Sequence, residues 1–208
     1  MVSLLGVLSF FSALAATSDA LSCTQCISSS STCSGNNVTC ASGFTCGSTY
    51  IETVEAGTTT TLLNRTCTNL SRCSVTGSLS MTPGKIRMGI TCCNSDNCTP
   101  SLPTLPAQGS NPNGRSCPSC ISTTGCNTTS TIQCTGDENM CLVLITQIPG
   151  SVSKTFRGCT TNSLCDLSSQ SQPVIMSNCT NGSPTTPSAH HIILTPPIVC
   201  LLLLIFLR

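Results

Sequence analysis

Two short cysteine pairs carry the first chemistry that this sequence suggests. Cys23 and Cys26, and again Cys117 and Cys120, are separated by two residues, the spacing of a zinc ligand pair or a thiol–disulfide redox site. A zinc site needs four clustered ligands from a reduced chain. The two histidines of the chain lie in a C-terminal segment that we expect to be removed. We therefore predict no metal, no cofactor and no redox catalysis.

Carboxylates are the other side chains that could do chemistry. Without histidine, a Ser–His nucleophile or a His-based acid–base step is excluded. Glu52 and Glu55 are expected to flank a hairpin tip, and Asp137 and Glu138 to lie on a solvated loop. We therefore predict that the protein is not an enzyme. The acids of the expected mature chain are Glu52, Glu55, Asp96, Asp137, Glu138 and Asp166.

The composition points to an oxidising compartment. The chain has 208 residues, of which 19 are cysteines, 7% are charged and 3% are aromatic, with a formal net charge of +1. So many cysteines are typical of a disulfide scaffold and unsuited to the reducing cytosol. The low content of Lys and Arg gives no basic surface for nucleic acid.

The N-terminus predicts a secretory signal peptide over residues 1–20. Val2 to Ala16 form an apolar run, and small residues follow it. The run is too short to span a membrane. Cleavage after Ala15 and cleavage after Ala20 both fit, and we favour Ala20. The alternative is a buried N-terminal helix.

The C-terminus predicts a glycosylphosphatidylinositol (GPI) attachment signal. Small residues at 181–183 are followed by a polar spacer over 184–191 and an apolar tail over 192–207 that contains two prolines. We predict Asn181 as the attachment residue, with Ser183 second, and residues 182–208 as a propeptide that is removed. A short transmembrane anchor is the alternative. Removal of Cys200 would change the odd cysteine count to an even one, as full disulfide pairing requires.

The remaining cysteines repeat. Eight cysteines from Cys23 to Cys92 recur from Cys117 to Cys179 at offsets of 92 to 95 residues for the first seven and 87 for the last. A constant offset of this kind indicates a duplicated module. We predict a first domain over residues 21–99, a linker over 100–115 that is rich in Pro, Gly and Ser, and a second domain over 116–181.

Each module is predicted to be built from short strands. Residues 45–54 and 58–67 read as a hairpin with a turn at 55–57, and residues 86–92 as one more strand. In the second module, residues 140–147 and 152–159 read as strands around a Pro149–Gly150 turn. No window shows convincing helical periodicity, so we expect an all-β, disulfide-rich fold.

The pattern CxxC, five further cysteines and then CCNSDNC at 92–98 resembles the lymphocyte-antigen/urokinase-receptor family of three-finger, snake-toxin-like domains. This resemblance covers both modules and implies two tandem three-finger domains whose CxxC cysteines are structural half-cystines. It implies the bridges Cys23–Cys46, Cys26–Cys33, Cys40–Cys67, Cys73–Cys92, Cys93–Cys98, Cys117–Cys141, Cys120–Cys126, Cys134–Cys159 and Cys165–Cys179.

Two positions depart from the family pattern. Thr99 and Thr180 stand where the family has an Asn whose amide closes the base of the domain, which makes the closure of each base uncertain. The second module also lacks the last small disulfide loop, so its third finger is expected to be short or irregular.

N-glycosylation sequons are frequent in this chain. Those that we predict to be modified are Asn37, Asn64, Asn69 and Asn127, whereas Asn97 and Asn178 abut half-cystines and are weaker candidates.

Function is expected to lie in recognition. We predict a GPI-anchored glycoprotein at the extracellular face of the plasma membrane that binds an extracellular or cell-surface protein through its finger loops, as a receptor or adhesion protein. Ile148, Pro149 and Lys154 are the candidate ligand contacts, unless this tip packs on the neighbouring module. The alternative is a soluble phospholipase inhibitor, because the two-domain layout and GCTTNSLCDL at 158–167 are similar to the gamma-type inhibitors of this family.

Overall fold

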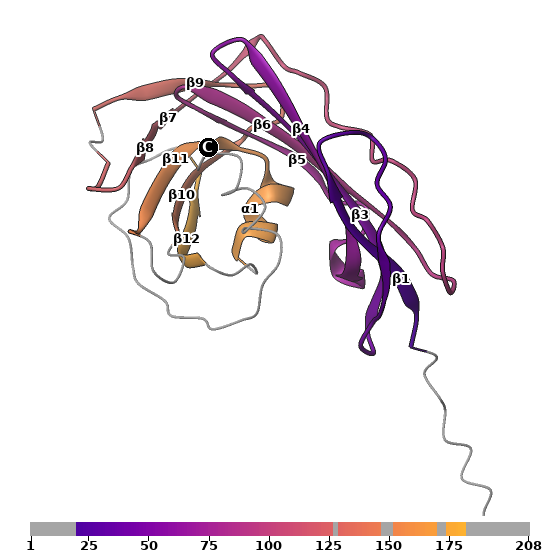
Figure 1. Cartoon of the computed structure of the whole chain (residues 1–208). Coiled ribbons are helices and arrows are strands. Elements are labelled where there is room, and N and C mark those ends of the chain that lie inside the picture. The colour runs from indigo at the N-terminus through magenta and orange to yellow at the C-terminus, as the bar shows by residue number, and fades with distance from the viewer. Residues whose placement is uncertain (1–19, 127–128, 147–151, 170–173, 182–208) are drawn as a thin grey trace, which may run out of the picture.

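The first module consists of three β-hairpins that extend from a disulfide-rich base (Figure 1). A computed structural model describes residues 20–126, 129–146, 152–169 and 174–181. The predicted hairpin at 45–67 is present, and its turn is a tight one in which Ala56 and Gly57 have φ angles of 49° and 81°. The strands are β1 (Ser22–Ser28), β2 (Asn36–Thr39), β3 (Phe44–Glu55), β4 (Thr58–Asn69), β5 (Thr76–Met81) and β6 (Gly84–Cys93), with a 3₁₀ turn η1 (Leu70–Arg72) after β4.

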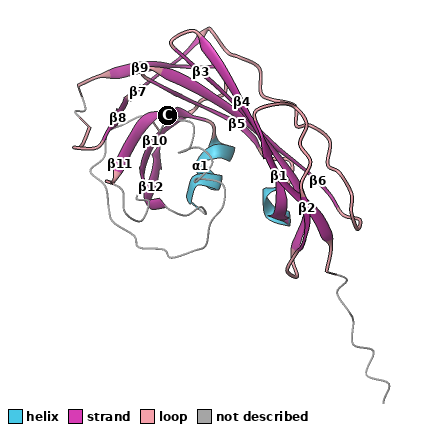
Figure 2. Ribbon diagram, viewed as in Figure 1, coloured by secondary structure: helices cyan, strands magenta, loops and turns pink. Residues whose placement is uncertain are grey.

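The second module repeats the plan with one replacement (Figure 2). Its strands are β7 (Pro112–Pro118), β8 (Cys120–Ser122), β9 (Thr131–Thr135), β10 (Met140–Thr146), β11 (Lys154–Thr160) and β12 (Val174–Thr180), with the helix α1 (Asn162–Ser169) between the last two. The expectation that no segment is helical is therefore wrong for α1. Leu164 and Leu167 are spaced three residues apart and both are buried, so one face of α1 packs on the sheet.

Disulfides take the place of a large apolar core at the base of each module. The nine bridges of the described chain join the same pairs that the family resemblance implies, with Cα–Cα distances of 5.2 to 6.3 Å. Two bridges stack in each base: Sγ of Cys23 lies 3.1 Å from Sγ of Cys40, and Sγ of Cys117 lies 3.3 Å from Sγ of Cys134. Cross-links of this kind restrict the unfolded chain, each contributing about 2–4 kcal/mol.

One continuous sheet joins the two modules. Its strand order is β12-β10-β11-β5-β6-β3-β4-β1-β2, and β11 of the second module pairs antiparallel with β5 of the first. Cys159 lies opposite Ser80, and Thr160 lies opposite Leu79. Figure 1 shows the two sets of strands meeting at this point. We call this contact, formed by β5 and β6 with β11, α1 and the turn at 135–138, the seam.

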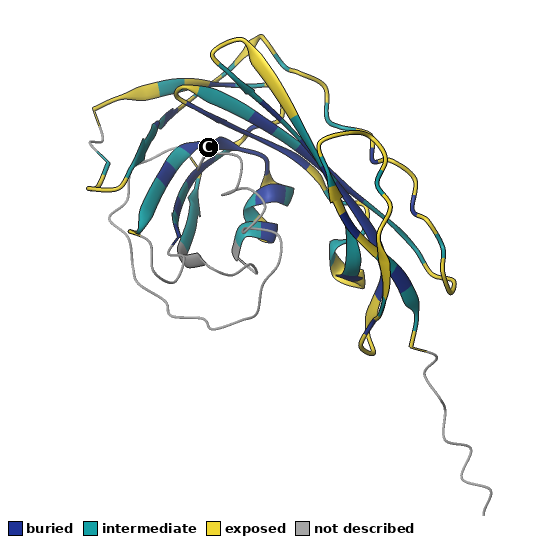
Figure 3. Cartoon of the chain, in the orientation of Figure 1, coloured by how far each residue is buried: buried dark blue, intermediate teal, exposed yellow. Residues whose placement is uncertain are grey.

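The main hydrophobic core also crosses the seam. Figure 3 shows buried segments on strands of both modules and on α1. Apolar side chains of β3, β5 and β6 share a cluster with those of β10, β11 and α1, so each module completes the core of the other. Because a single small module buries little apolar surface, this sharing increases what the tandem can bury. The cluster contains Ile51, Leu79, Met81, Ile86, Met88, Ile90, Leu142, Leu144, Phe156, Leu164 and Leu167.

The linker is held against the first module. Residues 99–110 have no regular secondary structure, as predicted, but β7 already begins at Pro112, within the range predicted for the linker. Arg87 Nη1 donates to the carbonyl of Pro106 at 2.8 Å, and Lys85 Nζ donates to the carbonyl of Gly109 at 3.3 Å. We call residues 99–111 the strap. It is therefore held against β6 instead of acting as a loose spacer.

Candidate functional site

Glu138 lies at the centre of the seam. Its side chain is fully buried, although a solvated loop was predicted at this position. Oε1 accepts hydrogen bonds from the hydroxyls of Ser78 and Ser80 at 2.7 and 2.8 Å, and Lys85 Nζ lies 3.3 Å away. Oε2 accepts longer bonds from Thr135 N and Oγ1. A carboxylate that is desolvated but fully paired holds the second module to the first.

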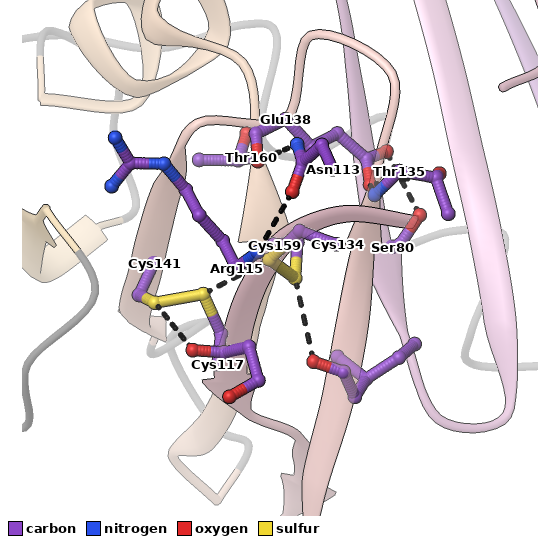
Figure 4. The surroundings of a disulfide bond; sticks show 12 residues. Ser80, Asn113, Arg115, Cys117, Cys134, Thr135, Glu138, Cys141, Cys159 and Thr160 are labelled. Carbon is purple, nitrogen blue, oxygen red and sulfur yellow. Dashed lines mark hydrogen bonds between the residues drawn. A yellow bond between two sulfur atoms is a disulfide. The ribbon is translucent and has the colours of Figure 1, made fainter. Parts of the chain in front are cut away.

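Local backbone contacts position this carboxylate. Glu138 N donates to Thr135 O, and Asn113 Nδ2 donates to the carbonyls of Gly136 and Glu138 at 2.9 and 3.1 Å. Figure 4 shows this turn beside the Cys134–Cys159 bridge. The sequence gives no direct signal for a buried carboxylate at 138, because the serines and the lysine that surround it come from β5 and β6 of the other module.

Further hydrogen bonds between the modules make the seam a specific interface. Thr82 N donates to Ser119 Oγ at 2.7 Å. Thr160 Oγ1 and Thr161 N both donate to the carbonyl of Ser78, each at 3.1 Å. The modules are therefore joined by a defined set of polar contacts as well as by apolar packing.

A second ion pair lies next to the seam, within the first module. Arg87 Nε of β6 donates to Glu52 Oε1 of β3 at 3.0 Å.

Two clefts open along the seam, each with a volume of about 490 Å³. Both are lined by Lys85, Gly109 and Thr135. The first continues to the start of α1 at Asn162, and the second to the hairpin tip at Ala56. Their side chains offer hydrogen-bonding groups, but no residue that lines either cleft forms a nucleophile–base pair. The clefts can receive polar groups of a partner, and the first of them also offers the exposed carboxylate of Asp137.

The carboxylates singled out in the sequence do not gather in one place. Glu52 pairs with Arg87, Glu138 is enclosed in the seam, and Asp96 accepts a backbone hydrogen bond at the base of the first module. Glu52, Glu138 and Asp96 are therefore paired with other groups of the protein, whereas Asp137 is exposed.

Partial burial lowers the pKa of the Arg72 guanidinium below its ordinary value, and this group remains a cation at neutral pH.

The cysteine pairs that suggested metal chemistry belong to disulfides. Three sulfurs cluster within 4.8 Å at each base, from Cys23, Cys40 and Cys67 in the first module and from the equivalent residues in the second. Each of these sulfurs forms a disulfide bond, so none is a thiolate that could ligate zinc.

A family model described as the u-PAR/Ly-6 domain matches this chain twice, over residues 19–101 and 113–193. The chain belongs to the u-PAR/Ly-6 domain family. It carries two such domains, and the three-finger fold predicted from the cysteine pattern is confirmed.

Known proteins resemble this u-PAR/Ly-6 chain over different shares of its length. A phospholipase A2 inhibitor gamma subunit of Laticauda semifasciata is 29% identical over 150 residues, which cover 69% of this chain and 79% of the relative. A phospholipase A2 inhibitor gamma subunit of Elaphe climacophora is 42% identical over 81 residues, covering 36% and 40% of the two chains. Among solved structures, that of mouse TEX101 is 21% identical with a TM-score of 0.30, covering 76% of this chain and 95% of that one.

The u-PAR/Ly-6 family residue that normally closes the base is replaced here by others. In the first module, Asp96 Oδ1 accepts a hydrogen bond from Ser22 N at 2.7 Å, and Asn97 N donates to Ser22 O at 2.8 Å. In the second, Arg115 Nη1 donates to the carbonyl of Asn181 at 3.2 Å. The sequence analysis did not assign a closing role to these residues, although the CCNSDNC segment contains Asp96 and Asn97.

Of the finger tips singled out in the sequence of this u-PAR/Ly-6 protein, the structure describes that of β3–β4 in full and that of β10–β11 only in part. Residues 56–60, at the tip of the β3–β4 hairpin, are exposed and polar. Of the predicted ligand contacts, Lys154 is half-buried at the start of β11, where it pairs with Thr146. Ile148 and Pro149 lie outside the described residues. Of the two finger tips singled out in the sequence, the β3–β4 tip is therefore the one whose exposure the structure describes.

The predicted glycosylation sites fall into three groups. Asn37 and Asn69 are exposed. Asn64 is only 6% exposed in β4, between Thr49 of β3 and Ile27 of β1, so a glycan does not fit in this packing and the prediction for this residue is wrong. Asn127 lies outside the described residues.

The residues at the C-terminal end of the described chain bear on the predicted attachment site. Asn181 is exposed and directly follows β12. The apolar tail and the predicted signal peptide lie outside the described residues. Within the described part of the chain, none of the helices has the length and apolar character needed to cross a bilayer.

Proposed function

We propose that this protein is a GPI-anchored glycoprotein of the cell surface that acts without catalysis, as a receptor or adhesion protein for an extracellular or cell-surface protein. The observation that carries the proposal is the C-terminal sequence: small residues at 181–183, a polar spacer and an apolar tail interrupted by Pro196 and Pro197. The signal sequence at residues 1–20 and the disulfide density agree with entry into the secretory pathway.

The position of Asn181 supports its role as attachment residue. It is exposed and follows the last strand by one residue, so a transamidase can reach it without unfolding β12. Its neighbours Gly182 and Ser183 are small. Lipid attached here would hold the base of the second module next to the membrane, and the domains would extend from it.

Recognition in this proposal uses loops that the disulfide base holds rigid. A loop ordered before binding loses less conformational entropy when the complex forms. The β3–β4 tip is one such loop. Ile148, Pro149 and Lys154 are proposed as a second set of contacts, of which Ile148 and Pro149 lie outside the described residues.

The anchor is tested on cells that express the full chain. A phosphatidylinositol-specific phospholipase is expected to release the protein from the surface. The variant N181W/S183W, which removes both small attachment residues, is expected to lose surface display. N178Q, a change within β12 outside the small-residue segment, is the matched control. Intact surface staining after phospholipase treatment would instead show a transmembrane anchor.

A second candidate function is inhibition of phospholipase A2. It is favoured by the similarity to proteins named phospholipase A2 inhibitors, which extends over both domains. We test it by adding the protein released from cells to purified secreted phospholipases A2, with the chemically reduced protein as control. Unchanged phospholipase activity together with no recovery in a pull-down would remove this candidate.

A further inference from the structure

We infer that Thr104 on the strap is a site of O-linked glycosylation, to which N-acetylgalactosamine is transferred from its uridine diphosphate sugar. The inference rests on the proposed passage through the secretory pathway. It concerns a residue outside the N-glycosylation sequons and outside the finger tips.

The backbone around Thr104 has the form that a glycosyltransferase needs. An enzyme that modifies a folded protein must bind several residues of extended chain, which strands in a ladder and tightly closed loops do not offer. Residues 99–110 have no strand or helix, and prolines at 100, 103 and 106 keep the chain extended. Segments rich in Ser, Thr and Pro are a typical composition of O-glycosylated chain.

The strap is anchored on both sides of Thr104 but not at it. Thr91 Oγ1 donates to the carbonyl of Ser101 on one side, and Arg87 Nη1 donates to the carbonyl of Pro106 on the other. Between these anchors, residues 102–105 make no hydrogen bond to another described residue. The exposed residues of this window, Leu102 and Thr104, are therefore accessible to an enzyme from the solvent side.

The packing of the strap decides which side chain faces outward. Pro103 is buried against Gly89, where an added Cβ would lie 2.8 Å from the Pro103 side chain and 3.1 Å from the carbonyl oxygen of Thr104. Because Pro103 and this carbonyl point toward β6, the side chain of Thr104 is directed to solvent, and the residue is exposed. Among the described residues, none forms a hydrogen bond with its hydroxyl.

Other exposed hydroxyls are less suited to the reaction. Ser28, Ser30 and Thr32 form hydrogen bonds with one another at the loop closed by the Cys26–Cys33 bridge, and Ser122 and Thr124 do so at the loop of Cys120–Cys126. Thr58 to Thr60 belong to β4 and are bound to β3 through the ladder. Ser110 also lies on the strap, but neither of its sequence neighbours is a proline, and it lies outside the window at 102–105.

The reaction is a simple group transfer. Oγ of Thr104 forms a bond with C1 of N-acetylgalactosamine while the bond from C1 to the β-phosphate oxygen breaks. Uridine diphosphate leaves with the electron pair and takes up the hydroxyl proton. The sugar would then project from the outer side of the strap, beside the residues at 106–109 that line the seam cleft.

The test uses the full chain, extracted from cells that cannot make the uridine diphosphate sugar. The disulfide-bonded protein is incubated with that sugar and a purified polypeptide N-acetylgalactosaminyltransferase, and modified peptides are sequenced by mass spectrometry. We expect one sugar on Thr104, at least a tenfold loss of transfer in T104A, and no change in the matched variant S110A.

Two results would overturn the inference. One is transfer to Ser101 or elsewhere with Thr104 unmodified. The other is transfer to Thr104 only after reduction of the disulfides, which would mean that the folded strap excludes the enzyme. N-glycans released from the same protein report separately on passage through the secretory pathway, so failure of the proposed function is distinguishable from failure of this inference.

Discussion

Replacing Lys85 by methionine should destabilise both modules together. Lys85 Nζ lies 3.3 Å from Glu138 Oε1, and the two side chains are 16% and 1% exposed. At this separation two unit charges attract by about 5 kcal/mol with an effective dielectric constant of about 20. Removing one partner of a buried pair typically costs about 3–5 kcal/mol, because the other charge stays desolvated.

For K85M we expect the free energy of unfolding to decrease by about 3 kcal/mol, at the lower end of that range. Ser78 and Ser80 still donate to the Glu138 carboxylate at 2.7 and 2.8 Å, and the partial exposure of position 85 allows water to approach. For a protein of this size, the loss corresponds to a decrease in Tm of about 6–12 °C. Since the modules share one core, a single transition should shift as a whole.

The measurement is thermal unfolding of the disulfide-bonded protein, followed by calorimetry and far-UV circular dichroism. The double variant K85M/E138Q keeps an oxygen acceptor for the two serines and removes both charges, so it should recover to within about 1 kcal/mol of the wild type. K154M, at the end of β11 away from the residues that pair with β5, is the matched control and should lower the free energy of unfolding by less than about 0.5 kcal/mol. A K85M protein as stable as K154M, or two separate transitions in the wild type, would refute this account of the seam.

Three further changes probe other parts of the chain. G158A should lower the free energy of unfolding, measured by calorimetry, by about 3 kcal/mol, because the added Cβ would lie 2.1 Å from the carbonyl oxygen of Ser80. A smaller loss would mean that the seam can shift to accept the methyl group. D96A should lower the free energy of unfolding in urea by about 1 kcal/mol, since it removes the exposed carboxylate that accepts a 2.7 Å hydrogen bond from Ser22 N. N64Q should leave the mass of N-glycans on the cell-expressed protein unchanged, because Asn64 is buried; a loss of one glycan would contradict the packing of β4.

Much of the fold followed from the cysteines and the strand pattern. Cysteine spacing is a local property of the sequence, and the family resemblance assigns a partner to each half-cystine. The hairpin at 45–67 also follows from sequence, because threonine and β-branched residues on both sides of a short turn favour pairing of adjacent strands. Signals of this kind depend on a few neighbouring residues, so they can be recognised without knowledge of the tertiary structure.

The site predictions were weaker because burial depends on distant residues. Asn64 carries a valid sequon, and only its place between β1 and β3 makes it inaccessible. Similarly, α1 has two leucines three residues apart, a pattern too short to predict a helix. Its stability comes from packing on the sheet, as for most short helices in proteins.

The sequence by itself determined the duplication, the disulfide-rich β fold and the candidate processing signals at both ends, because each depends on residue type and spacing along the chain. Tertiary structure alone decided that the two modules share their largest sheet and their main core, and that the strap is held against the first module. It also turned Glu138 from an expected surface residue into the buried centre of the seam. The physical reason is that its partners, Ser78, Ser80 and Lys85, are more than 50 residues away in sequence and meet it only when β11 pairs with β5.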